Sequence, residues 1–326
     1  MEDLHLAILL GSIVAGAAPI LLATLGETIA EKGGVINLSL DGSILLSAMV
    51  AFAVSYQSQS LCLGFLAGAA AGGLVALIVG FFSIYLGQSQ VAVGFVLTLT
   101  ARDLAYFFGN PYSRLYGPQA GPLPIPMLHE IPFLGPILFQ HTMPVYGSIL
   151  LIGLCWWYLY RTPMGLRLRA VGENPQASYA RGTNTRRVQL LSTLIGGLLV
   201  GLAGATFSLC TKPGWGRPQG AEGTGWICLA IVIFGGWHPV KAAFGAYLFA
   251  FLQVMGIHFQ GWWPSIPAQV FQVAPFPLMI FTLVLMYAAQ LERESMVKKR
   301  PPWLQRLLNM LGGNAPAALG KAFIPE

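Results

Sequence analysis

Long apolar stretches dominate the sequence and limit the possible fold more than any other feature. The chain is 55% hydrophobic and only 9% charged, whereas roughly a quarter of the residues of a soluble domain are charged. A helix of about 20 apolar residues crosses a hydrocarbon core of about 30 Å. Candidate spans lie near 5–25, 62–86, 90–109, 144–160, 190–210, 241–258 and 270–290, and shorter ones near 41–57 and 223–236. The sequence therefore predicts an all-α polytopic membrane protein with about nine transmembrane helices, within a range of about eight to ten.

Lysine and arginine are unevenly distributed among the polar segments, and this predicts the orientation. Cytoplasmic loops collect these residues. They cluster in the loop 161–189 and in the tail 293–326, whereas the connection 109–143 contains only Arg114. We therefore expect residues 1–292 to form the transmembrane domain, with the loop 161–189 and the tail inside and the connection 109–143 outside. The net charge of +6 reflects this orientation, so no nucleic-acid partner is expected.

The N-terminus is expected to lie outside as part of a retained helix. Its first residues, MEDLHLAILL, carry acids where a secretory signal peptide carries lysine or arginine. Residues 5–25 therefore form the first span in this interpretation.

Two apolar segments, one in each half of the chain, are interrupted by glycine and polar residues. They are EKGGVINLSLDGSILLSA (31–48) and GAEGTGWICLAIVIFGGWHP (220–239). Non-helical backbone at membrane depth is tolerated only where it is buried in protein or lines a wet cavity. Paired interruptions in two halves of a chain indicate a transport pathway. The alternative is that 26–40 is an ordinary cytoplasmic loop and 212–224 an external one.

Polar and aromatic side chains near these interruptions are the candidate residues of a solute pathway. The first interruption supplies three of them and the facing segments supply possible opposite walls. The candidates are Asn37, Ser39, Asp41, Thr98, Thr100 and Trp226. A second interpretation is that Asn37 and Ser39 only satisfy backbone groups freed by the interruption.

Two charged residues, Arg102 and Asp103, fall inside the span expected at 90–109. A charge at mid-membrane costs about 2.5 to 3.5 kcal/mol on insertion scales and usually faces a bundle interior or a wet cavity. Three roles stay open: Arg102 reaches the outer interface by snorkelling, the two residues form ion pairs between helices, or they contact the passing solute.

Small residues at four-residue spacing predict close helix packing. Gly64, Gly68 and Gly72 form one such series, and Gly197, Gly201 and Ala205 form another. In membranes this spacing lets helix backbones approach closely. A structural role is predicted for both series.

Histidine and cysteine do not form a recognisable catalytic or metal-binding pattern. His129, His141, His238 and His258 lie in loops or near span ends without an HExxH motif, and the four cysteines lack metal-type spacing. We expect no catalytic residue, metal site or cofactor, and a membrane enzyme is an unfavoured alternative.

The arginine-rich loop contains the segment GENPQA, residues 172–177. Asparagine is a preferred N-cap and proline is favoured at the first helical position. The segment therefore predicts a turn and then a short helix, capped by Asn174 and beginning at Pro175. Such a helix on the cytoplasmic face is typical of a docking element, although a solvated loop without a partner is the alternative.

Four segments resemble one family of transport proteins. RTPMGLRLRAVGENPQAS (161–178) resembles the coupling segment of ATP-binding-cassette (ABC) importer permeases of the branched-chain amino acid and simple-sugar class. EKGGVINLSLDG (31–42) is similar to the motif after their first helix. WICLAIVIFGGWHPVKAAFGAYLFAFLQ (226–253) is closest to the nucleoside and purine uptake branch, with QVAVGFVLTLTARDLAYFFG (90–109) as a weaker match.

The resemblance implies a multi-pass permease subunit of the bacterial inner membrane that carries a nucleoside or purine-like heterocycle. It implies three kinds of partner: ABC ATPase subunits, a second permease that makes a heterodimer, and an extracytoplasmic substrate-binding protein. It assigns ATPase coupling to Gly172, Glu173, Asn174, Pro175 and Ala177. No phosphate-loop motif GxxxxGK[ST] occurs in the sequence, so ATP hydrolysis is expected on a partner and the chain itself is not an enzyme.

The sequence departs from the family pattern at a few positions, and other functions stay open. Asp41 stands where glutamate is common, Thr98 where the branch commonly has asparagine, and Arg102 and Asp103 where apolar residues are usual. One alternative is an importer of the same architecture for a simple sugar or a flavin. Another is a stand-alone secondary transporter, which would need paired intramembrane acids; only Asp41, Asp103 and Glu222 are counted as candidates.

Overall fold

The computed structural model describes residues 2–262, together with positions 270, 277, 280, 281, 284 and 313, residues 315–321, and Phe323. The long helices are α1 (Glu2–Lys32), α2 (Leu40–Ser58), α3 (Leu61–Gly80), α4 (Gln90–Gly109), α5 (Met143–Arg161), α8 (Thr185–Thr206) and α10 (Pro239–Trp262). The shorter ones are α6 (Pro163–Glu173), α7 (Pro175–Ala180) and α9 (Thr224–Phe234). Single π-helical turns extend α3 over Phe81–Tyr85 and α8 over Phe207–Thr211, and another lies at Gly135–Phe139.

The predicted all-α membrane architecture is confirmed for the described residues. Seven helices are long and apolar enough to cross a membrane, and α9 is shorter. Two boundaries differ from the prediction: α1 continues to Lys32 rather than ending near 25, and α2 is a complete span. The span expected at 270–290 and the basic part of the tail lie largely outside the described residues.

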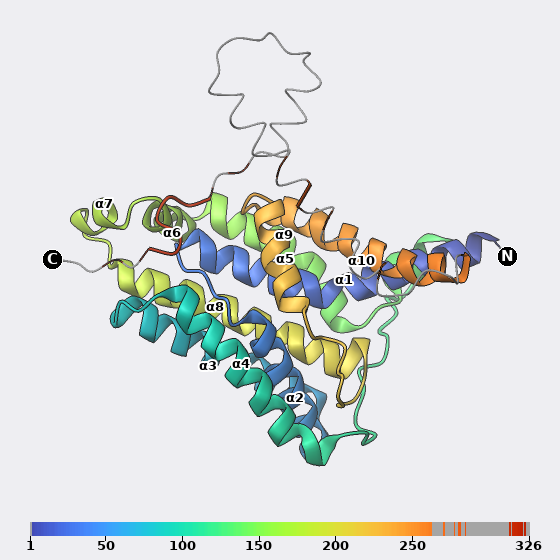
Figure 1. Ribbon diagram of the computed structural model, residues 1–326. Coiled ribbons are helices and arrows are strands. Elements are labelled where there is room, and N and C mark those ends of the chain that lie inside the picture. Colours follow the sequence, from blue (N-terminus) through green and yellow to red (C-terminus); the bar gives the residue numbers. More distant parts are fainter. Residues whose placement is uncertain are drawn as a thin grey trace, which may run out of the picture.

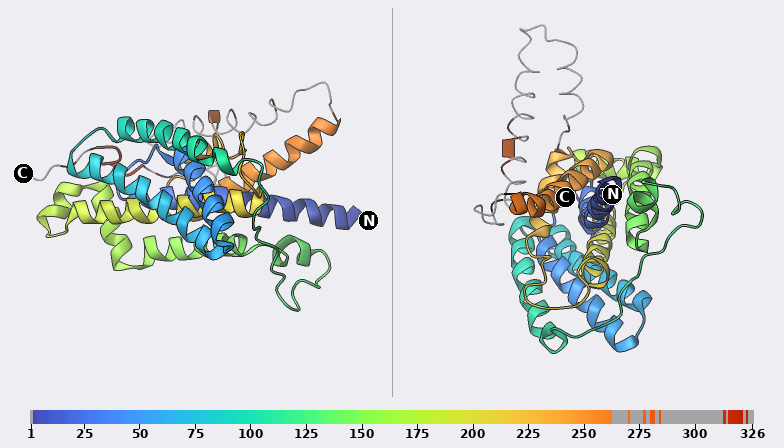
Figure 2. Two further views of the ribbon diagram at one scale, coloured as in Figure 1. Left: turned by 90° about the horizontal axis from the view of Figure 1, so that it is seen from below. Right: turned by 90° about the vertical axis from the view of Figure 1, so that its right-hand side faces the viewer.

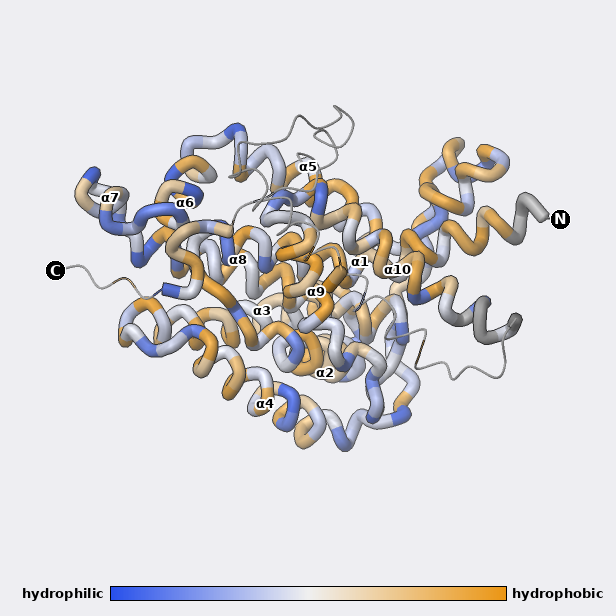
Figure 3. Tube along the Cα trace, turned by 45° about the horizontal axis from the view of Figure 1, so that its top comes forward, coloured by the Kyte–Doolittle hydropathy of each residue, from blue (hydrophilic) through white to orange (hydrophobic). Residues whose placement is uncertain are grey.

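Helices α1 and α8 run side by side through the middle of the molecule (Figure 1). Helices α2, α3 and α4 lie on one side of this pair, and α5, α9 and α10 lie on the other. The short helices α6 and α7 lie at one end, while the beginning of α1 and the connection 110–142 lie at the opposite end (Figure 2). Hydrophobic residues follow the lengths of the long helices, and hydrophilic residues gather at α6 and α7 (Figure 3).

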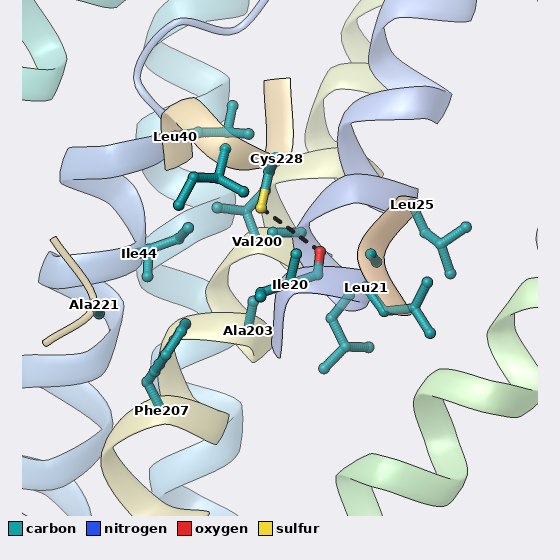
Figure 4. Packing of buried hydrophobic residues seen from close by; sticks show 14 of the residues in the cluster. Ile20, Leu21, Leu25, Leu40, Ile44, Val200, Ala203, Phe207, Ala221 and Cys228 are labelled. Atoms are coloured by element: carbon teal, nitrogen blue, oxygen red, sulfur yellow. Dashed lines mark hydrogen bonds between the residues drawn. The ribbon is translucent and has the colours of Figure 1, made fainter. Parts of the chain in front are cut away.

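The buried core forms where α1, α2, α8 and α9 meet. Leu21 on α1, Ile44 on α2 and Val200 on α8 are all fully buried in one cluster. Cys228 of α9 reaches into this cluster and its thiol donates to the carbonyl oxygen of Ile20, with Sγ 3.6 Å from the oxygen (Figure 4). Cys228 therefore packs as a small, weakly polar core residue, as cysteine commonly does.

The two glycine series pack against each other along α3 and α8. A Cβ on Gly72 would lie 2.4 Å from the carbonyl oxygen of Gly197, and one on Gly201 would lie 2.3 Å from that of Gly68. A Cβ on Gly68 would lie 2.9 Å from the Cβ of Ala205. The predicted structural role is confirmed, because the backbones are close enough to exclude larger side chains.

Replacing Gly72 by valine is therefore expected to separate α3 from α8. Overpacking a close contact typically costs about 1 to 3 kcal/mol, and here the obstructing atoms are backbone atoms that have little room to move. The measurement is the thermal unfolding midpoint of the purified protein in detergent. Gly153→Val is the matched control, because a Cβ on Gly153 meets nothing within 4 Å. Equal midpoints for the two variants would contradict the packing argument.

Candidate functional site

The first interruption is a buried, non-helical segment between α1 and α2. Side chains of the neighbouring helices replace the missing helical hydrogen bonds: Gln90 Oε1 accepts from Ile36 N at 2.8 Å, and Glu27 Oε1 accepts from Asn37 N at 2.9 Å. Thr98 Oγ1 donates to the Leu38 carbonyl oxygen at 2.6 Å. Buried backbone groups need such partners. An ordinary solvated loop over 26–40 is wrong, because α1 extends to Lys32 and most of the following residues are buried.

The polar candidates of this segment hydrogen-bond mainly to one another. Asn37 Oδ1 accepts from the backbone N of Ser39 at 3.1 Å and from its Oγ at 2.5 Å, and Ser43 Oγ lies 3.1 Å from Ser39 Oγ. Asn37 and Ser39 are buried. Their side chains therefore stabilise the shape of the interruption. This agrees with the interpretation that the two residues satisfy backbone groups freed by the interruption.

The second interruption precedes α9 and meets the start of α2. Asp41 Oδ1 accepts from Gly225 N at 3.1 Å. The backbones are in close contact, since a Cβ on Gly225 would lie 2.2 Å from Asp41 N. The two interrupted segments, far apart in sequence, thus adjoin at Asp41 and Gly225.

Glu222 holds the non-helical backbone just before α9. Its carboxylate accepts from Gln219 N at 2.7 Å, from Gly220 N at 2.5 Å and from the hydroxyl of Tyr106 on α4. Burial alone would raise the pKa of this carboxyl, but these hydrogen bonds outweigh burial and lower the pKa below its ordinary value. Glu222 is therefore charged at neutral pH, and its hydrogen bonds fix the backbone of the loop before α9.

A pair of buried glutamates on α1 joins both interruptions. Glu27, 1% exposed, binds the first interruption at Asn37 N, while Glu31, 3% exposed, accepts from the indole N–H of Trp237 in the turn between α9 and α10. The two acids lie four residues apart and therefore share one face of α1.

Sequence reasoning missed these two acids because the first span was expected to end near residue 25. Their four-residue spacing in GETIAEK (26–32) was the available signal, since residues i and i+4 share a helix face. The count of intramembrane acids as Asp41, Asp103 and Glu222 was therefore wrong. Gln90 and Trp237 were also missed as partners of the interruptions.

The remaining pathway candidates, Thr100 and Trp226, are exposed, unlike the buried residues of the first interruption. Trp226 follows Gly225 directly and its ring lies 6.5 Å from that of Phe95 on α4, measured between centroids. Both rings are partly exposed, Phe95 at 50% and Trp226 at 37%. Thr100 is exposed and donates to Val96 O of its own helix. Two residues along a helix differ by about 200° in direction, so Thr98 and Thr100 face opposite sides of α4.

Arg102 and Asp103 form an ion pair with each other on α4. Arg102 Nε lies 3.5 Å from Asp103 Oδ1, and their side chains are 43% and 74% exposed. Within the described part of the chain, Arg102 pairs with its neighbour on the same helix. An ion pair that joins α4 to another helix is not observed there. Exposed pairs of this kind typically contribute at most about 1 kcal/mol.

The predicted short helix of the arginine-rich loop is confirmed as α7. Asn174 is its N-cap and Asn174 Oδ1 accepts from Ala177 N at 2.9 Å, with Pro175 in the first turn. Gly172 and Glu173 lie at the end of α6, and α6 and α7 together contain the residues expected to couple to an ATPase. Residues 163–180 are therefore called the coupling segment below. Figure 1 shows α7 projecting at the end of the molecule. The side chains of Asn174, Ala177 and Tyr179 are exposed.

Two arginines of the same loop lie over aromatic rings of α5, one within that helix and one from α6. Arg161 lies 5.5 Å from the Trp156 ring centroid and Arg169 lies 4.9 Å from that of Tyr160. Cation–π contacts of this kind contribute about 0.5 to 1 kcal/mol at exposed sites.

The coupling segment contacts the first interruption directly. A Cβ on Gly172 would lie 2.1 Å from the Lys32 carbonyl oxygen and 3.4 Å from Gly34 N. Gln189 of α8 adds a hydrogen bond from Nε2 to the carbonyl oxygen of Gly33 at 3.2 Å. The end of α6, directly before α7, is thus in backbone contact with the end of α1, a few residues before Asn37.

Comparison with known proteins gives a consistent family. The family described as branched-chain amino acid transport system / permease component matches residues 9–288. The nucleoside ABC transporter permease protein NupC of Lactococcus lactis is 31% identical over 294 residues, which cover 86% of this chain and 92% of that protein. The guanosine ABC transporter permease protein NupQ of Bacillus subtilis is 31% identical over 297 residues, covering 85% and 91%.

An archaeal relative has a different solute in its name. The permease protein TsgC13 of Haloferax volcanii, which its name assigns provisionally to glucose ABC transport, is 35% identical over 256 residues. The match covers 77% of this chain and 78% of that protein. No solved structure matches the chain.

Proposed function

Since the chain belongs to the family of branched-chain amino acid transport system permease components, and is therefore a multi-pass transmembrane permease subunit, we propose that it carries a nucleoside or purine-like heterocycle through an ABC importer. The observation that carries this proposal is the similarity to two permeases named for nucleoside and guanosine transport, which extends over more than nine-tenths of their lengths. The partly exposed ring pair Phe95 and Trp226 supports it, because aromatic faces offset-stack with planar rings.

The partners in this proposal follow from the arrangement of the coupling segment. An ABC ATPase docks on the exposed side of α7, and a second permease completes the pathway beside α4 and the start of α9, where Phe95, Thr100 and Trp226 are exposed. A substrate-binding protein delivers the solute at the opposite end of the molecule. Gly172, Glu173, Asn174, Pro175 and Ala177 would then transmit ATPase movement, because Gly172 contacts the end of α1.

The competing candidate is a simple sugar, favoured by the 35% identity to TsgC13. Vesicles containing the chain with its ATPase and second permease would be tested for uptake of labelled guanosine, with unlabelled adenosine, guanine and glucose as competitors. We expect guanosine uptake that is reduced by adenosine or guanine and unaffected by glucose. Uptake of labelled glucose that guanosine does not inhibit would favour the sugar instead.

Replacing Asn174 and Pro175 together by alanine is expected to weaken ATPase docking or coupling while membrane insertion stays normal. The N-cap contributes only about 1 kcal/mol, so the fold tolerates its loss. The measurements are the amount of copurified ATPase and the uptake rate at matched expression. Asn184→Ala is the matched control, because Asn184 is an exposed N-cap of α8, its Oδ1 accepting from Arg187 N at 3.1 Å. If both variants copurify equal amounts of ATPase and have equal uptake rates, the coupling role of α7 is contradicted.

A further inference from the structure

The C-terminal residues pack back onto the end of the molecule that carries the coupling segment. In Figure 1 their described part lies beside α6. Gly313 is in backbone contact with Gly236 in the turn between α9 and α10, since a Cβ on Gly236 would lie 2.7 Å from Gly313 Cα. Gly236 has φ of +59°, a conformation that favours glycine. This is the first of three places at which the described C-terminal residues contact the helices and the interruptions.

The second place is the junction of the first interruption with the coupling segment. Ala318 N donates to the Gly172 carbonyl oxygen at 3.0 Å, and Gly320 N donates to the Gly34 carbonyl oxygen at 3.2 Å. The carbonyls at a helix end and in a non-helical segment have no helical partner of their own. The C-terminal residues therefore satisfy one backbone acceptor at the end of α6 and one between α1 and α2. Ala317 N adds a hydrogen bond to Glu173 Oε2 at 3.3 Å.

The third place is α7 itself. The ring of Phe323 lies 5.9 Å from the ring of Tyr179, measured between centroids at 59°. Phe323 is only 9% exposed, although it lies near the end of the chain, and Ala318 is 6% exposed. The burial of these two side chains indicates that the C-terminal residues pack specifically against the coupling segment.

We propose that these C-terminal residues form a strap, comprising Gly313, residues 315–321 and Phe323, that positions the coupling segment relative to both interruptions. A displacement of α7 then reaches the Gly34 backbone through two successive hydrogen bonds of one short segment, and the α9–α10 turn through the Gly313 contact. The strap thus adds a second connection to the direct contact between Gly172 and Lys32. This inference rests on the proposed function, in which an ATPase moves α7.

The test is the ratio of solute uptake to ATP hydrolysis in vesicles that contain the full complex. Gly320→Val is the disruptive variant, because Gly320 has φ of +75° and its Cβ would lie 3.1 Å from Ile36 Cδ1. Lys321→Ala is the matched control, since Lys321 is the next residue and is exposed. We expect Gly320→Val to assemble and hydrolyse ATP while uptake per ATP falls at least about twofold, and Lys321→Ala to match the unaltered complex.

A second variant keeps the test decisive if Gly320→Val assembles poorly. Phe323→Ala removes the buried ring that contacts Tyr179 and is expected to lower the same ratio, whereas the conservative variant Phe323→Tyr is expected to keep it. An unchanged ratio in Phe323→Ala, or a loss of uptake that follows only the amount of assembled complex, would overturn the strap. Failure of the proposed function is a distinct result, because the unaltered complex would then show no ATP-dependent uptake.

Discussion

Replacing Glu27 by alanine is expected to abolish most uptake and to lower the stability of the folded chain by at least about 1 to 3 kcal/mol, the cost of leaving a buried donor without its acceptor. The donor is Asn37 N, 2.9 Å from Glu27 Oε1. Glu31, one turn further along the same face of α1, keeps its own hydrogen bond with Trp237. The change therefore releases the first interruption from α1. The measurements are the unfolding midpoint in detergent and the initial uptake rate of the assembled complex.

Glu27→Gln separates this explanation from a requirement for charge. Glutamine keeps an acceptor oxygen for Asn37 N and carries no charge. We expect Glu27→Gln to retain most stability and uptake. Equal loss in both variants would mean that a carboxyl group itself is required, and normal uptake in Glu27→Ala would contradict the bridging role.

Replacing Gly225 by alanine is expected to reduce uptake at least about fivefold by moving the start of α9 away from α2. Overpacking costs about 1 to 3 kcal/mol, and about 1.4 kcal/mol corresponds to a tenfold change in rate. The added methyl would lie 2.2 Å from Asp41 N and 2.4 Å from Asp41 Cα. These are backbone atoms, so a side-chain rotation cannot relieve the contact. The hydrogen bond from Gly225 N to Asp41 is expected to be lost with it.

The comparison variant for Gly225 is Gly216→Ala in the loop before α9. A Cβ on Gly216 meets nothing within 4 Å, so the same chemical change is made without a contact. Uptake would be measured at equal amounts of assembled complex. If Gly225→Ala transports as well as Gly216→Ala, the junction of the two interruptions does not matter for transport.

Local features of the fold followed from residue types and spacing. The cap of α7 was predictable because asparagine and proline have strong positional preferences at a helix start, and the structure has Asn174 and Pro175 in those places. The glycine series were predictable because small residues at four-residue spacing leave one face of a helix open. The sequence did not indicate that the two series face each other, since that depends on how α3 and α8 are placed.

The principal error concerned the end of the first helix. Polar residues after Gly26 indicated the end of the span, yet α1 continues to Lys32 with Glu27 and Glu31 buried. An acid in a helix is compatible with burial only if distant groups supply hydrogen bonds, and here they come from Asn37 and Trp237. Those partners are set by tertiary structure and could not be read from the span itself.

The pathway candidates divide in a way that sequence could not anticipate. Asn37, Ser39 and Thr98 are buried and bound to neighbouring groups, whereas Thr100 and Trp226 lie on exposed surfaces. The rotation of α4 about its own axis decides which of Thr98 and Thr100 is buried. In the proposed assembly the second permease faces Thr100 and Trp226. The solute would therefore contact these two residues before it contacts the residues of the interruption.

The central claim is that this chain moves its solute only when a partner hydrolyses ATP. The most direct measurement compares uptake of labelled guanosine by vesicles containing the chain alone with uptake by vesicles containing the complete complex, with ATP supplied on the face that carries α7. We predict no ATP hydrolysis and no accumulation by the chain alone, and ATP-dependent accumulation by the complex. Accumulation by the chain alone, driven by a proton or sodium gradient without ATP, would contradict the claim.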